Sequence, residues 1–433
     1  MRKSRAKAPV KDIPQPILKR VGRMVNVQAF MSTVPQQHHL ALDAHSLREA
    51  LDAHARYLAG RSGGRRLNLT YADLANTSLE GVDLRDADLT GACLGGASLA
   101  RSNLSRAILF GADLREADMR HVNLKRADLR ACMRGANLAG AEMAGCDLRE
   151  GRIALQDKLD GFRILRHEHR PGELNYAVLA GANLTGAQMT GAVAMSSDFT
   201  DANLSGAILT GAKLMRAIMD GADLTNADLA GADLTGASMK RAVLNGVNLN
   251  QTRLDDCDLT GVLRAPPAIF YIDDRSLTEV VAEHEQFCDT GGGKGAVLKM
   301  GEIDFRPMKA LKRRRLSGLS APSSIFFDMD LEGVQFQGAD LSNCDFRGAN
   351  LREADLRGAR FTSAQMARAD LRGAKMGPLA LGDNRFVRTD FTRASLRGAD
   401  LRGAHAPRAR FLEAEMDGAR VAGCDLSGAE LEV

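Results

Sequence analysis

The residues best suited to chemistry lie between the regular parts of the chain. His167, Glu168 and His169 form a His-x-His motif with an intervening carboxylate, a pattern that can suggest a metal site. No third ligand lies at a useful spacing, and a closed metal site needs about four. We therefore interpret this stretch as a polar loop or a short helical excursion.

A second stretch, Thr290 to Gly295, superficially resembles a phosphate-binding loop. The required pattern GxxxxGK[ST] is absent, because Gly295 follows Lys294 where Ser or Thr must stand. A turn that stops a helix is the favoured interpretation. We find no nucleophile with a base, no metal spacing and no cofactor fingerprint, so we expect no catalytic residue, cofactor or metal, and no enzyme.

Positive charge gathers outside the regular parts. Residues 1–43 are rich in Lys, Arg and Pro and are expected to form a flexible basic arm. A second cluster is either a solvated loop or a binding site for an acidic partner. Its residues are the candidates for partner binding: Lys309, Lys312, Arg313, Arg314 and Arg315.

Two short segments predict matching helices. Residues 46–57 and 276–287 share Ser, Leu, Glu, His and an aromatic residue at equivalent positions, and a Gly-rich turn follows each. In both, Ser is the expected N-cap and Glu completes a capping box. We expect each helix to close an open end of the repeats. The candidate capping residues are Ser46, Glu49, His54, Ser276, Glu279 and His284.

The rest of the chain repeats with a period of five, most clearly over residues 181–260. Each unit has a large apolar residue and, two positions earlier, a small one. Both are expected in the core. Central residues include Leu184, Leu204, Leu224, Leu234, Leu244, Leu351 and Leu371, and small inward residues include Ala182, Ala202, Ala222, Cys257 and Cys344.

This period fits neither a helix nor a simple alternating strand. Residues i and i−2 point to the same face of an extended segment, and the Gly that often precedes the small residue suits a corner. Each unit is therefore one short side plus one turn. A chain built this way closes into coils that stack about 4.8 Å apart.

The units resemble the pentapeptide-repeat family, with its consensus A(D/N)LXX; Gly221–Thr225 and Ala232–Gly236 fit it residue for residue. The resemblance implies a right-handed, four-sided β-helix with four units per coil. Residues twenty apart should then stack, such as Asp233 on Lys213 and Arg253, and Asp355 on Lys375. Some members of the family mimic duplex DNA and bind DNA gyrase or related topoisomerases.

The expected fold class is an all-β solenoid, a right-handed quadrilateral β-helix in three repeat blocks with capping helices and inserts. The expected segments are a basic arm (1–43), a capping helix and turn (44–66), block 1 (67–153), an insert (154–176), block 2 (177–262), a second insert with the second helix and basic cluster (263–324), and block 3 (325–433). Block 3 keeps its register through Leu381 and Phe386. The sequence leaves open whether the blocks make one rod or separate stacks.

Composition supports a thin core and narrows the function. The 433 residues contain no Trp and 4% aromatic residues, as expected for a solenoid whose interior is one side chain wide. The seven Cys residues show no metal-like spacing, which favours reduced thiols and a cytoplasmic location. No run of apolar residues is long enough for a membrane span.

The favoured function is a rigid, non-enzymatic scaffold that binds a protein partner. A DNA mimic is an alternative, although the net charge of +4 departs from the acidic surface that mimicry requires. Binding of nucleic acid or an anionic surface through the basic arm and inserts is another. The C-terminal coil is a candidate surface for a homodimer, which removal of residues 412–433 should abolish.

Overall fold

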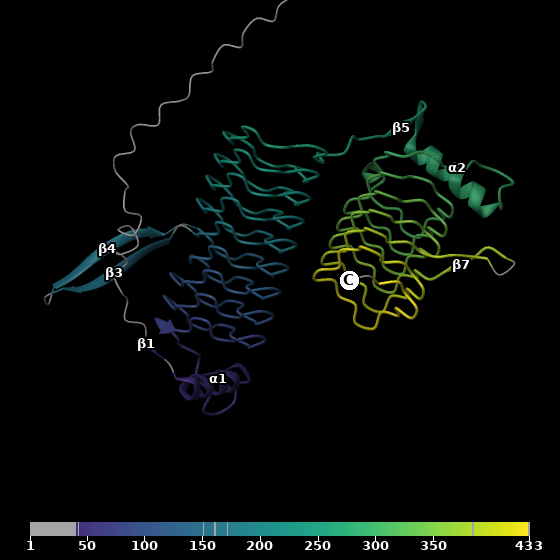
Figure 1. Cartoon of the computed structure of the whole chain (residues 1–433). Coiled ribbons are helices and arrows are strands. Elements are labelled where there is room, and N and C mark those ends of the chain that lie inside the picture. Colours follow the sequence, from purple (N-terminus) through teal and green to yellow (C-terminus); the bar gives the residue numbers. More distant parts are fainter. Residues whose placement is uncertain are drawn as a thin grey trace, which may run out of the picture. The chain divides into compact units, whose positions relative to one another are not determined.

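The computed structural model describes residues 40–41, 43–149, 151–159, 162–170, 172–382 and 385–431. Nearly all of the expected basic arm lies outside these residues. The described residues form two stacks of coils, with a short helix at the beginning of each stack (Figure 1). We call the stack from Leu67 to Leu263 the N-terminal solenoid and the stack from Leu298 to Leu431 the C-terminal solenoid.

Parallel bridges, most of them between residues twenty positions apart, define both solenoids. They run from Asn68↔Asp88 to Val243↔Leu263 and from Lys299↔Ser320 to Arg410↔Glu430. Four five-residue units therefore make one coil. The expected stacking of Asp233 on Lys213 and Arg253, and of Asp355 on Lys375, is confirmed.

The expected blocks 1 and 2 form one continuous ladder. Cys132 bridges Glu173 and Asp147 bridges Gln188, so the ladder passes directly across the insert. The insert itself is an antiparallel hairpin of strands β3 (Gly151–Leu159) and β4 (Phe162–Arg170), not a polar loop or a helical excursion. The His-x-His motif lies on β4.

The repeats that carry Asp or Asn before the central residue satisfy nearly all of their backbone groups in the same way. In the unit Ala232–Gly236, the N–H of Thr235 donates to Asp233 Oδ1 at 3.1 Å, which explains the preference for Asp or Asn. The last residue of the unit, here Gly236, has a positive φ and forms the corner. In the described coils, the ladder leaves the carbonyl oxygen of the corner residue without a backbone donor.

The interior consists of the large and small residues that the repeat predicts. Most of the named core residues are fully buried, but Leu244 and Cys257 are only partly buried because they belong to the last coils of the N-terminal solenoid. The C-terminal solenoid replaces many Leu residues with Phe. Phe326 and Phe346 stack at 4.6 Å, and Phe361, Phe391 and Phe411 form a second stack with ring centroids 5.1 and 5.0 Å apart.

The C-terminal solenoid differs from the expected block 3 at two places. Its ladder already begins at Lys299, so residues 298–324 belong to coils and only 264–297 form the connection. The assignment of Leu381 and Phe386 to the core is wrong. Both are exposed on a hairpin of strands β7 (Leu379–Ala380) and β8 (Phe386–Val387), because the chain leaves the coil at Gly377 and returns at Thr389.

The two helices begin in different ways. Helix α1 (Ala44–Leu58) has Asp43 as its N-cap, so the predicted capping box of Ser46 and Glu49 is wrong. The Asp43 carboxylate already accepts the N–H groups of His45 and Ser46. Helix α2 (Leu277–Asp289) does have the predicted capping box of Ser276 and Glu279.

The remaining short elements connect these parts. Strand β1 (Leu40–Ala41) pairs in parallel with β2 (Ala72–Asp73) at the edge of the first coil. Strands β5 (Tyr271–Ile272) and β6 (Arg275–Ser276) form a small hairpin before α2, and a 3₁₀ turn, η2 (Arg306–Met308), widens one corner of the C-terminal solenoid.

Candidate partner-binding surfaces

The two histidines of the helices occupy equivalent positions at the starts of the solenoids. His54 Nδ1 accepts the N–H of Leu67 at 3.0 Å, and His284 Nδ1 accepts the N–H of Leu298 at 3.0 Å. Both side chains are fully buried. We propose that they act as caps, because each accepts the N–H of a residue where its ladder begins.

These contacts require uncharged imidazoles. A ring nitrogen that accepts a hydrogen bond carries no proton, and burial lowers the pKa of both His54 and His284 below the ordinary value. The other nitrogen of His284 lies 3.6 Å from Cys288 Sγ, which also donates to the Ser317 carbonyl. This arrangement suits packing rather than nucleophilic chemistry, and burial raises the pKa of the Cys288 thiol.

The basic cluster proposed for partner binding is largely neutralised within the chain. Lys312 pairs with Glu332 at 2.9 Å, and Arg315 pairs with Asp289 of α2 at 2.7 Å. Arg314 pairs with Glu285, also on α2, and Arg313 lies 3.9 Å from Glu332. Arg314 and Arg315 therefore attach α2 to the first coils of the C-terminal solenoid, and the four pairs together leave little uncompensated positive charge.

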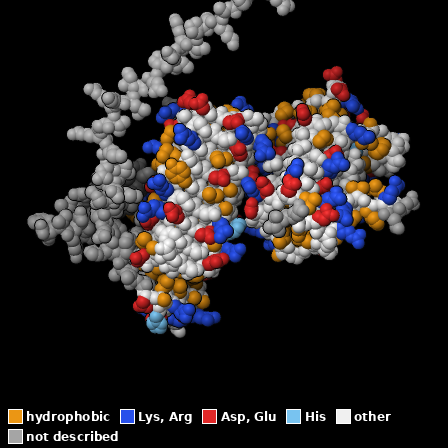
Figure 2. Space-filling model, in the orientation of Figure 1, with side chains coloured by type: hydrophobic (Ala, Val, Ile, Leu, Met, Phe, Trp, Pro, Cys, Tyr) orange, Lys and Arg blue, Asp and Glu red, His pale blue; other side chains and the backbone are white. Residues whose placement is uncertain are grey.

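Both signs of charge are mixed over the face that Figure 2 shows. Many of the Asp residues that form the bridges between coils pair with an Arg two residues later. Asp113 pairs in this way with Arg115, and Asp118 with Arg120. Such pairs prevent a continuous row of uncompensated acidic side chains along the coils. Within the described part of the chain, no group of three or more potential metal ligands occurs, and no helix is long and apolar enough to cross a membrane.

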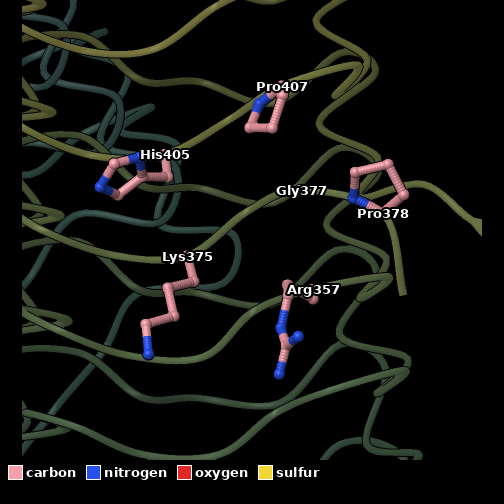
Figure 3. A pocket seen from close by; sticks show the side chains of 6 residues that line it. All are labelled: Arg357, Lys375, Gly377, Pro378, His405 and Pro407. Atoms are coloured by element: carbon pink, nitrogen blue, oxygen red, sulfur yellow. The ribbon is translucent and has the colours of Figure 1, made fainter. Parts of the chain in front are cut away.

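A hollow of about 400 Å³ lies beside the start of the β7–β8 hairpin (Figure 3). Arg357, Lys375 and His405 line it from successive coils, together with Gly377, Pro378 and Pro407. The Arg357 guanidinium is already bound to Asp355, with Nη2–Oδ2 at 2.7 Å. Lys375 and His405 are exposed, so the hollow does not enclose a set of converging groups.

The β7–β8 hairpin is a firmly anchored projection with an apolar end. Thr389 is fully buried at its base; its hydroxyl contacts the carbonyls of Leu356 and Gly377 and accepts the N–H of Gly358. Leu381 and Phe386 are 53% and 57% exposed, and Val387 is exposed as well. Sequence analysis missed this surface because its apolar residues keep the five-residue register.

A second feature that sequence analysis missed is a buried group of charges. Arg347, on the C-terminal solenoid, is 2% exposed and lies near Asp201 of the N-terminal solenoid. Burial raises the pKa of the Asp201 carboxyl, while the surrounding arginines Arg347, Arg397 and Arg368 oppose that shift. The only signal in the sequence was an Asp–Arg spacing that recurs on many exposed repeats.

These features define a parallel β-helix of five-residue repeats. A family model described as pentapeptide repeats matches eight segments that together cover more than half of the chain. The chain therefore belongs to the pentapeptide repeat family. The matched segments are residues 65–99, 97–132, 173–211, 197–236, 222–261, 330–364, 339–377 and 394–432.

Solved structures show the same kind of similarity. The pentapeptide repeat protein Rfr23 from the cyanobacterium Cyanothece 51142 is 28% identical over 30% of this chain and 89% of its own, with a TM-score of 0.26. HetL, involved in heterocyst differentiation regulation in Nostoc sp. strain PCC 7120, is 18% identical over 90% and 95%, with a TM-score of 0.19.

QnrB1, a plasmid-mediated fluoroquinolone resistance protein, is 18% identical over 46% of this chain and 92% of its own, with a TM-score of 0.33. No curated protein matches the sequence significantly. The assignment to the family rests on the repeat match and on the coil geometry described above.

Proposed function

We propose that the protein is a non-enzymatic scaffold that binds a protein partner, with the β7–β8 hairpin as a principal contact. The observation that carries this proposal is the exposed apolar surface of Leu381, Phe386 and Val387 on a hairpin whose base is anchored by Thr389. Burial of the exposed Leu, Phe and Val side chains in an interface would remove apolar surface from water, which favours association. The anchored base of the hairpin limits the conformational entropy that is lost on binding. The stacked coils hold this contact in place.

Two variants would test the hairpin. Replacing Leu381 and Phe386 with Ser removes the apolar end, whereas Ile218→Ser removes an exposed apolar residue from the flat face of a coil. Tagged full-length proteins would capture partners from nuclease-treated lysate of the host, with identification by mass spectrometry. The L381S/F386S variant should lose the salt-resistant partners that the wild type and I218S retain.

Capture that is unchanged by L381S/F386S would contradict the hairpin as the contact. Gyrase or topoisomerase subunits as the main salt-resistant partners would favour the DNA-mimic alternative, which the mixed surface charge does not support. Loss of all capture after nuclease treatment would favour nucleic-acid binding. The basic arm would then be the candidate region, since the Lys309–Arg315 cluster is mostly paired with carboxylates.

A homodimer through the C-terminal coil is a separate proposal. Val421 and Leu431 are exposed in that coil, and Met416 and Leu426 are only partly buried. Removal of residues 412–433 should convert such a dimer to a monomer in light scattering. A dimer that survives the truncation would exclude this surface.

A further inference from the structure

Arg347 has an unusual environment for its local motif. Like Arg357, Arg372 and Arg402, it binds the Asp two residues before it through two parallel hydrogen bonds. The side chains of those three arginines are 40–46% exposed, whereas that of Arg347 is 2% exposed. A different neighbour must therefore cover Arg347.

That neighbour is a corner of the N-terminal solenoid. Arg347 Nη1 donates to the carbonyl oxygens of Gly221 and Arg241, at 2.7 and 2.8 Å. These two residues occupy corners one coil apart. Their carbonyls are the backbone acceptors that the ladder leaves free, so Arg347 uses acceptors that every coil provides.

The same contact continues along both solenoids. Arg368 Nη1 donates to the carbonyl of Asp201 at 2.6 Å, and Arg397 Nη1 lies 3.6 Å from Asp201 Oδ2. Asp201 is the corner one coil before Gly221. We call Asp201, Gly221 and Arg241 the corner column, and Arg347, Arg368 and Arg397 the arginine face.

The chemistry of this contact favours arginine. A guanidinium offers several donors in one plane, so it can bind a carboxylate on one side and carbonyls on another. Successive corners repeat at the coil spacing of about 4.8 Å. A ligand of the corner column therefore needs guanidinium groups at about that spacing, on a surface that can approach a row of corners.

We propose that the corner column is an arginine-recognition surface, which the arginine face of the same chain occupies and which can also take the arginine face of a second copy. A second copy is the occupant that fits, since it carries the same arginines at the same spacing. The connector between the solenoids, residues 264–270, is mostly exposed. The proposal rests on these contacts and does not depend on the hairpin or on any scaffold partner.

The first experiment asks whether the contact holds without the connector. A recognition sequence for a site-specific protease replaces residues 265–268 in the full chain, and the folded protein is then cut. The halves should co-elute in size-exclusion chromatography at low salt. Replacing Arg347, Arg368 and Arg397 with Ser should weaken their association by about 30-fold or more, because buried charged contacts are lost.

The matched control replaces Arg357, Arg372 and Arg402 with Ser. It removes the same number of charges from the same solenoid and breaks the local Asp–Arg motif that Arg347 also forms. Because these three arginines do not contact the corner column, the control should keep the halves together. Circular dichroism checks that each variant is folded, and R368S alone serves if the triple variant is not. Halves that separate in the wild type, or that respond equally to both variants, would overturn the proposal.

The second experiment asks whether a second copy can bind. The uncut R347S/R368S/R397S chain keeps its corner column but lacks its own arginine face. A fluorescent C-terminal half from the cut wild type should transfer to it and co-elute. The same half should not transfer to uncut wild type, whose column is occupied. Failure to transfer to the variant would reject recognition of a second copy.

Discussion

At the scale of single residues, the repeat depends on one hydrogen bond that its consensus conceals. In many units an Asp or Asn precedes the central Leu and accepts the N–H two residues later, as Asp223 does from Thr225 at 3.0 Å. Without this side chain, that N–H would have no partner within these units, since the ladder does not use it. The residue is therefore selected for the turn of the backbone, and its charge is secondary.

The capping histidines predict a dependence of stability on pH. Burial lowers the pKa of His54 and His284 below the value of about 6.5 expected for an unfolded chain. At a pH just below this value, the unfolded state therefore binds more protons than the folded state. The free energy of unfolding should then fall as the pH drops from about 7 towards 5. The nearby carboxylates of Asp83 and Asp86 oppose the shift at His54, and Glu285 opposes it at His284.

Thermal midpoints measured from pH 7.5 to 5 would check this expectation. The H54N/H284N variant offers an acceptor that does not titrate, so its midpoint should change less over this range. His405→Gln is the control, because His405 is exposed. Equal pH profiles for wild type and H54N/H284N would show that the caps do not contribute.

At the scale of elements, the two helices make a matched pair with different N-caps. Ser276→Ala should destabilise the C-terminal solenoid by about 1 kcal/mol, because it removes the N-cap of α2. Ser46→Ala should be nearly neutral, since Asp43 caps α1, and Asp43→Ala should cost about as much as S276A. Chemical denaturation followed by circular dichroism measures all three, and a large effect of S46A would contradict this assignment.

The base of the β7–β8 hairpin supports a second prediction. Thr389→Val keeps the shape of the side chain but leaves the buried N–H of Gly358 without its acceptor, at a cost of about 1–3 kcal/mol. Local opening should then speed tryptic cleavage at Arg385 and Arg388 by roughly tenfold or more. Thr392→Val is the control, because the Thr392 hydroxyl bonds only the side chain of Asp390. Equal cleavage rates in the two variants would contradict the anchoring role.

Sequence periodicity predicted the coils, the core positions and both helices, because each depends on local spacing. It could not distinguish Leu381 and Phe386 from core residues, since an exposed hairpin of suitable length keeps the same register. It also could not show that carboxylates of α2 neutralise Arg314 and Arg315. Arg347 is buried by residues more than 100 positions away in the sequence, and the local Asp–Arg spacing does not reveal them.

At the scale of the whole molecule, the described chain has two separate hydrophobic cores, one in each solenoid. Coils contact mainly their neighbours, so each solenoid should unfold as its own unit. Phe346→Ala should cost about 3–5 kcal/mol and lower one thermal transition, while Leu224→Ala should lower the other. Differential scanning calorimetry would resolve the two, and a single transition shifted equally by both variants would show one cooperative unit.

The place where each hairpin leaves its coil has a consequence for how such a protein can change. Both the β3–β4 and the β7–β8 hairpins depart after the residue that follows a central Leu or Met, and both return at the next small inward residue. The ladder continues across each gap with its core intact. A corner is therefore a natural insertion point, at which new loops can be acquired by evolution or grafted by engineering without redesign of the interior.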